Sequence, residues 1–168
     1  MGDKLQRRIE SDLDSLDSYN LYYKWIPSRY MIRPTLKLIQ EKLDKILLIE
    51  SEWVSFFDFI VHHVFEENFT YNSDGKKYIM NYNQSKLKKW IFKPSDFQYQ
   101  IPNNSNHYIL WSSEYNINYD FDDSIINCTI IEHIKKIVGN DEFDFAWYKN
   151  PKPTIPEFYH VQVFWIKL

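Results

Sequence analysis

Glycine is scarce in this sequence, with only Gly2, Gly75 and Gly139 among 168 residues. The Walker loop and the dinucleotide-binding fingerprint both need closely spaced glycines, because the backbone must come close to the phosphates. These three glycines are too far apart to build either loop. The sequence therefore excludes both of these nucleotide-binding motifs.

Cysteine is also rare, since Cys128 is the only one. It cannot form an internal disulfide, and a chain without Cys-x-x-Cys pairs is typical of a reducing compartment such as the cytoplasm. We expect Cys128 to be a small apolar residue on a helix. The five histidines complete no zinc-binding spacing, so we expect no metal.

A strong charge bias and a long apolar run are both missing. The formal net charge is −3 and both signs are mixed along the chain, unlike the basic surface of nucleic-acid-binding proteins. No run of about 18 apolar residues is present, and the charged residues 1–17 do not resemble a signal peptide. We therefore expect neither nucleic acid nor a membrane as partner. The sequence does not define an oligomeric state.

Hydrophobic residues make up 44% of the chain and aromatic residues 18%, which is enough for the core of one domain. Apolar residues at helical spacing predict an amphipathic helix over 35–49. A second helix is predicted to begin at an N-cap, Ser51, and to end by Asn68. A third helix is predicted over 122–138, with an aspartate as its cap, and a short one within 3–18.

Strand signals dominate the second half of the chain. Asp74-Gly75 lies between two aromatic runs and predicts a hairpin over 69–82. Further strands are expected at 89–92, 107–112, 143–149 and 158–167. We predict an α+β fold, an antiparallel sheet with packed helices, and right-handed parallel βαβ units are the main alternative. A single domain is expected, with an N-terminal extension, a helical part and a sheet-containing part at 1–34, 35–67 and 69–168.

The last predicted strand carries a candidate site residue, His160. Strand alternation puts His160 and Gln162 on one face and Val161 on the other. Histidine titrates near neutral pH, so it can act as a base, an acid or a nucleophile. A hydrogen-bonded structural histidine on a half-buried sheet is the alternative interpretation.

A second candidate, His107, begins a buried strand after a loop that contains Asp96. If both reach one edge of the sheet, Asp96 would orient this histidine, as a carboxylate does in many acid–base sites. Trp111 and Trp147 lie on the strands nearest to the two histidines, where a planar ring can stack on a ligand. The three other histidines are expected outside the site: His62, His63 and His133.

Two blocks of residues resemble the GlcNAc-induced protein family, a domain of unknown function in fungi and large DNA viruses. One block is 95–102 followed by the strand at 107–112, and the other contains 147–151, Ile155-Pro156 and His160-Val161. Their order and spacing agree with that family over about residues 94–166. The resemblance implies roles for Asp96, His107, Trp111, Asn150 and His160. Gln162 stands where the family has a second histidine.

The order of elements also resembles the histidine-triad nucleotide-binding proteins, because a strand begun by a histidine precedes a helix and two strands. Their uridylyltransferase branch closes with His-x-His-x-Gln, and the middle histidine is the nucleophile. This sequence has Phe158, His160 and Gln162 at those positions, so two of the three match. The resemblance implies a histidine-triad-like fold and pocket.

Three functions are compatible with these residues. The favoured one is N-acetyl transfer from acetyl-CoA to the amine of a nucleotide-linked amino sugar, in a viral glycan pathway of the host cytoplasm. There, His160 or His107 accepts the ammonium proton, Asp96 orients this base, and Asn150 or a backbone N–H holds the oxyanion.

The second is a nucleotidyl hydrolase or transferase in which His160 attacks the α-phosphate and Gln162 holds a phosphate oxygen. The third is a non-catalytic module that binds a sugar nucleotide or a protein. For the site itself, we predict that His107 and His160 face one pocket. Its predicted border consists of Asp96, Trp111, Asn150 and Gln162.

Overall fold

Helical and extended segments alternate along the chain. The computed structural model describes residues 36–82, 90–98, 101, 104–114, 120–150, 153 and 155–168. Its helices are α2 (Leu36–Glu52), α3 (Phe56–His63) and α4 (Asp123–Val138). Its strands are β1 (Thr70–Tyr71), β2 (Lys77–Tyr78), β3 (Trp90–Pro94), β4 (Ser105–Ser112), β5 (Phe143–Tyr148) and β6 (His160–Lys167). The helix predicted within 3–18 lies outside the described residues.

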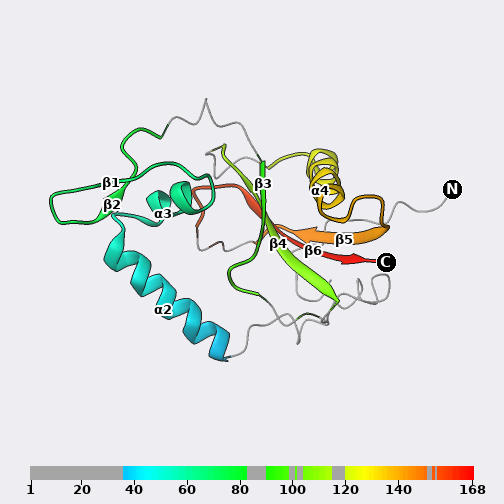
Figure 1. Cartoon of the computed structure of the whole chain (residues 1–168), viewed down its shortest axis with the longest axis horizontal. Coiled ribbons are helices and arrows are strands. Elements are labelled where there is room, and N and C mark those ends of the chain that lie inside the picture. The colour runs from blue at the N-terminus through cyan, green and yellow to red at the C-terminus, as the bar shows by residue number, and fades with distance from the viewer. Residues whose placement is uncertain are drawn as a thin grey trace.

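Four strands form one sheet in the order β3-β4-β6-β5, and each neighbouring pair is antiparallel (Figure 1). This arrangement confirms the predicted α+β fold with an antiparallel sheet, and the parallel βαβ alternative is wrong. The central strands β4 and β6 each have 8 residues. Their register pairs Trp111 with His160, Ile109 with Gln162 and His107 with Phe164. Side chains of paired residues lie on the same face of a sheet, so these six share one face.

Helix α4 packs on the opposite face of this sheet. Asp122 caps the helix, since its Oδ1 accepts a hydrogen bond from the Ser124 amide at 2.8 Å. Gly139 follows the helix with a φ of 67°, which glycine adopts without a steric clash. Both ends therefore agree with the prediction. The core between α4 and the sheet includes Ile126, Ile130, Ile134, Phe145, Trp147, Val161 and Val163.

Helices α2 and α3 lie on the face that carries His160. Ser55 caps α3, because its backbone is extended and its Oγ accepts a hydrogen bond from the Asp58 amide at 3.1 Å. The prediction that Ser51 is the cap is wrong. Ser51 lies in the last turn of α2 and donates its hydroxyl hydrogen to the Leu48 carbonyl at 2.7 Å. Ser55 and Asp58 have the Ser-x-x-Asp spacing of a capping box, which Ser51 lacks.

The hairpin predicted at Asp74-Gly75 is present as β1 and β2. Gly75 has a φ of 77° at the turn, and the Asn72 carboxamide oxygen accepts hydrogen bonds from two amides of the same turn. Lys77 joins the hairpin to the end of α2 through a 2.8 Å ion pair with Glu52. The hairpin therefore supports the junction between the two helices.

We expect Ile130→Ala to lower the free energy of unfolding by about 2–5 kcal/mol, because the truncation leaves a cavity between α4 and the sheet. Ile130 is 0% exposed, whereas Ile125 of the same helix is 46% exposed. Ile125→Ala is the matched control and should change the free energy by less than about 1 kcal/mol. Urea unfolding followed by circular dichroism measures both values. Equal losses in the two variants would contradict this packing.

Candidate functional site

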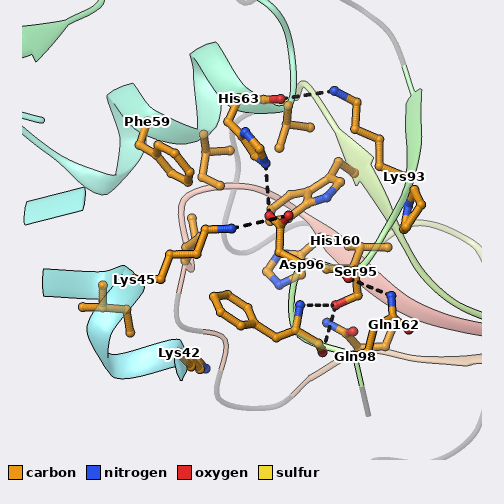
Figure 2. A pocket seen from close by; sticks show the side chains of 18 of the residues that line it. Lys42, Lys45, Phe59, His63, Lys93, Ser95, Asp96, Gln98, His160 and Gln162 are labelled. Carbon is orange, nitrogen blue, oxygen red and sulfur yellow. Dashed lines mark hydrogen bonds and ion pairs between the residues drawn. The ribbon is translucent and has the colours of Figure 1, made fainter. Parts of the chain in front are cut away.

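A cavity of about 480 Å³ lies between the α2–α3 helix pair and the His160 face of the sheet. Such a volume is typical of small-molecule sites, which range over roughly 300–1,000 Å³. Figure 2 shows helices on one side of this cavity and strands on the other. Most of the apolar lining is isoleucine and phenylalanine, together with Trp111. The polar lining consists of Lys42, Lys45, His63, Lys93, Ser95, Asp96, Gln98, His107, Asn150, His160 and Gln162.

His160 is buried at the start of β6 and lines the cavity. Its Nδ1 donates a hydrogen bond to the Phe158 carbonyl at 2.9 Å, so the neutral ring carries its lone pair on Nε2. The ring stacks on Trp111, with 4.5 Å between centroids and 28° between planes. Burial lowers the pKa of His160 below its ordinary value, although the bond to Phe158 opposes this and nearby Lys149 adds to it. His160 is therefore a neutral, oriented imidazole at neutral pH.

His107 is buried on the same face of the sheet, opposite Phe164, and forms a hydrogen bond from Nε2 to Gln162 Oε1 at 2.6 Å. Its ring also stacks on Phe164, with 4.9 Å between centroids. Burial lowers the pKa of His107 to about 4, and the bond to Gln162 opposes this shift only in part. Because the Gln162 oxygen is taken by His107, the Nε2 hydrogens of Gln162 are what this side chain can offer a ligand.

Asp96 lies in the cavity wall, but it does not orient His107 as the sequence suggested. Its Oδ2 accepts a hydrogen bond from His63 Nε2 at 3.0 Å, and its Oδ1 lies 3.4 Å from Lys45 Nζ (Figure 2). The hydrogen bond from His63 lowers the pKa of Asp96 below its ordinary value, with help from Lys45 and against partial burial. The carboxylate is therefore the partner of a histidine on α3, since the turn after β3 directs it toward the helices.

His63 is the residue that the sequence reasoning missed. Adjacent helix residues point about 100° apart, and the two neighbours do take different environments. His62 donates from Nδ1 to the Glu67 carbonyl at 2.7 Å and packs on Trp53, whereas His63 lines the cavity. A signal was present, because His63 follows Phe56 and Ile60 at i+7 and i+3 on the helix side that faces the sheet.

The remaining predicted residues divide between the two faces of the sheet. Trp111 and Asn150 line the cavity together with His107, His160, Gln162 and Asp96. The prediction of Trp147 as a ligand-stacking residue is wrong. It pairs with Val163 across β5 and β6, lies in the α4 core, and donates from Nε1 to Asn127 Oδ1 at 2.8 Å. His133 also lies on the α4 side, where its ring contacts Phe92.

The charged side chains of the lining are mainly cationic. Lys42 and Lys45 come from α2 and Lys93 from β3, whereas Asp96 is the acidic residue in the lining. Asp96 is paired with Lys45 and His63, and Lys93 lies 3.5 Å from Glu66 outside the lining. An anionic ligand is therefore electrostatically favoured over a cationic one.

None of the helices in the described ranges is long and apolar enough to cross a membrane. No group of three or more histidine, cysteine, aspartate and glutamate side chains converges as metal ligands would in that same part of the chain.

Comparison with known proteins identifies neither a family nor a function for this chain. No family model matches the sequence, and no curated protein is significantly similar to it. The crystal structure of HTC1 is similar at 10% sequence identity and a TM-score of 0.47, over 91% of this chain and 81% of that one. The resemblances to the GlcNAc-induced and histidine-triad families therefore stay predictions.

We expect acidification to destabilise the protein through His107. Its pKa is about 4 in the folded state and about 6.5 in an unfolded chain. The unfolded chain therefore binds more protons between these values, and stability is lost as the pH falls from about 6.5 towards 4. Each pKa unit corresponds to about 1.4 kcal/mol, so the loss from His107 is at most about 3.5 kcal/mol.

Urea unfolding of the wild type and of His107→Asn at several pH values between 7.5 and 4.5 measures this contribution. His133 and His160 also have lowered pKa values, so part of the slope should persist in the variant. Identical pH slopes for both proteins would contradict a buried neutral His107.

Proposed function

We propose that this protein transfers or hydrolyses a nucleotidyl group, with His160 Nε2 as the nucleophile. The observation that carries this proposal is the bond from His160 Nδ1 to the Phe158 carbonyl. It fixes the ring, directs the lone pair to Nε2, and stabilises the positive charge that the ring gains on attack. Burial favours the neutral, nucleophilic form of the ring over the protonated form.

In the proposed reaction, His160 Nε2 attacks the phosphorus of a nucleoside phosphate derivative. A bond from Nε2 to phosphorus forms, and the bond from phosphorus to the leaving group breaks with its electron pair. Water or an acceptor hydroxyl then attacks the phosphorus and returns the electron pair to Nε2. Gln162 lies beside His160 on β6, and its Nε2 hydrogens suit a phosphate oxygen.

The charge and shape of the cavity support an anionic substrate with an apolar part. Lys42, Lys45 and Lys93 suit the phosphate, while the isoleucine and phenylalanine side chains suit a base. A nucleotide-linked sugar combines these properties and belongs to the substrate class that we propose.

Acetyl transfer from acetyl-CoA to an amino sugar stays a prediction. The cavity offers it less support, because the ammonium group of the acceptor would approach three lysines. A histidine whose pKa is lowered by burial is also a weaker base for that ammonium proton. The third function, non-catalytic binding of a sugar nucleotide or a protein, also stays a prediction, and for a sugar nucleotide it differs from the proposal only in the absence of turnover.

We expect His160→Asn to reduce turnover by at least about 10³-fold, because the covalent step loses its nucleophile. Wild-type protein mixed with nucleoside phosphoramidates or nucleotide-linked sugars should carry an acid-labile nucleotidyl adduct on the peptide that contains His160. Mass spectrometry of rapidly quenched samples detects this adduct. Gln162→Ala and Gln162→Glu form a matched pair, and the carboxylate should be the more harmful change because it repels the phosphate.

The same experiment separates the three functions. Acetylation of a UDP-amino sugar by acetyl-CoA, without any adduct, would favour the acetyltransferase over the proposal. Binding of nucleotide-linked sugars without turnover of any substrate would favour the binding module.

The pH dependence of turnover provides a further prediction. The reactive form is neutral His160, and burial lowers its pKa. Activity should therefore persist below the ordinary histidine pKa of about 6.5 and decline only at more acidic pH. The measurement is the rate constant for adduct formation between pH 8 and pH 4.5. A decline centred at or above the ordinary value would contradict a buried nucleophile.

A further inference from the structure

Helix α2 lies at the edge of the molecule (Figure 1) and is apolar on two sides. Leu38, Ile46 and Ile49 line the cavity, whereas a second row of apolar side chains follows the outer side of the helix. This outer stripe consists of Leu36, Ile39, Leu43 and Leu47, whose exposed fractions lie between 42% and 86%. Because each helix residue turns by about 100°, the centre of the outer stripe lies about 120° around the helix from the cavity side.

The spacing of the outer stripe is that of a helix–helix contact. Its intervals of 3, 4 and 4 residues keep the four side chains in one row along the helix. Helix α4 is a contrast, because its exposed isoleucines, Ile125 and Ile137, are 12 residues apart. Single apolar residues are common on protein surfaces, but a continuous exposed row marks an interaction site. A second amphipathic helix fits a row that is about 17 Å long and one helix wide.

We propose that the outer stripe is the interface of a homodimer, in which α2 packs antiparallel against α2 of a second copy of this chain. A two-fold axis through the middle of the stripe brings Leu36 opposite Leu47 of the second copy, and Ile39 opposite Leu43 of the second copy. Each apolar side chain then has an apolar partner, and the symmetric contact leaves no further stripe exposed. Ile39 also lines the cavity, so the second copy contributes its Leu43 to the rim of the cavity.

The charges beside the outer stripe favour the antiparallel direction. Lys37 and Asp44 are seven residues apart and therefore flank the stripe on the same side. Antiparallel pairing brings Lys37 of each copy close to Asp44 of the other, whereas parallel pairing brings residues of like charge to the same level. Lys37 also lies 3.7 Å from Glu41 of its own helix, and 85% of its side chain is exposed. Such exposed pairs contribute less than about 1 kcal/mol, so Lys37 can exchange this partner on association.

The outer stripe is too narrow for a permanent dimer. Stable interfaces bury about 800 Å² on each partner, and smaller ones are typical of weak, transient complexes. We therefore expect a reversible dimer with a dissociation constant in the micromolar range. The monomer must then be folded on its own, which agrees with the core between α4 and the sheet.

Analytical ultracentrifugation of the full chain measures the association. The wild type should shift from the mass of one chain, 20.6 kDa, towards twice that mass as its concentration rises through the micromolar range. Leu43→Glu should stay monomeric, because it buries a carboxylate from each copy in the middle of the apolar contact. Ile125→Glu is the matched control on α4, since Ile125 is 46% exposed and Leu43 is 48% exposed. This control should dimerise like the wild type.

A charge swap tests the direction of the helices without removing any apolar side chain. Lys37→Asp and Asp44→Lys should each weaken dimerisation by roughly 3- to 10-fold, because like charges then meet twice in the symmetric pair. The double variant should recover the affinity of the wild type.

Cross-linking tests the register of the two helices. The background is Cys128→Ser, since Cys128 is exposed. Chains that carry Leu36→Cys should form disulfides with chains that carry Leu47→Cys, and neither should form them with itself. A disulfide needs Cα atoms within about 7 Å of each other, whereas the two ends of the outer stripe are about 17 Å apart.

Three results would overturn the proposal. Disulfides of each single variant with itself would contradict the antiparallel arrangement, and full dimerisation of Leu43→Glu would assign the interface to another surface. A wild type that stays monomeric at every concentration would exclude the dimer. A loss of thermal stability in Leu43→Glu would then assign the outer stripe to a partner within the chain, such as the helix predicted within 3–18. None of these measurements depends on turnover, so the proposed function is tested separately.

Discussion

In the pairing of β4 with β6, Trp111 lies opposite His160, and His107 lies diagonally across from Gln162. Each polar side chain is then held by a neighbour, through ring stacking or a hydrogen bond. A shift of β6 by one residue would turn Val161 and Val163 toward the cavity and bury His160 against the isoleucines of α4. Because that face offers an apolar surface, the polar groups would lose their partners. The cavity floor therefore depends on this single register.

The features that sequence reasoning identified correctly are those that a local repeat determines. His160 and Gln162 do share a face that excludes Val161, because alternation along a strand needs no knowledge of the rest of the fold. Helix α4 could also be predicted from local sequence, because its isoleucines, its aspartate cap and Gly139 lie within one continuous segment. The antiparallel sheet was also predictable, because short strands separated by turn signals favour that arrangement.

Features that depend on contacts between distant segments could not be predicted from local sequence patterns. The face that Trp147 takes is determined by its pairing with Val163 rather than by the pattern of β5 alone. The bond between His63 and Asp96 joins residues 33 positions apart, and it exists only because the last residue of α3 lies next to the end of β3. The N-cap at Ser55 is a different case, because its pairing with Asp58 is a local signal that the choice of Ser51 overlooked.

One side-chain type meets three environments around this cavity, and this difference distinguishes His160, the proposed nucleophile, from the other two histidines. His107 is desolvated and bonded to Gln162, His160 is bonded to a backbone carbonyl, and His63 is bonded to a carboxylate near solvent. A phosphoryl group that reaches His160 loses water, so its charge must be compensated inside the cavity. Gln162 supplies amide hydrogens from the sheet, whereas two of the three lysines extend from α2. The position of α2 against the sheet therefore determines whether an anion can approach His160 at all.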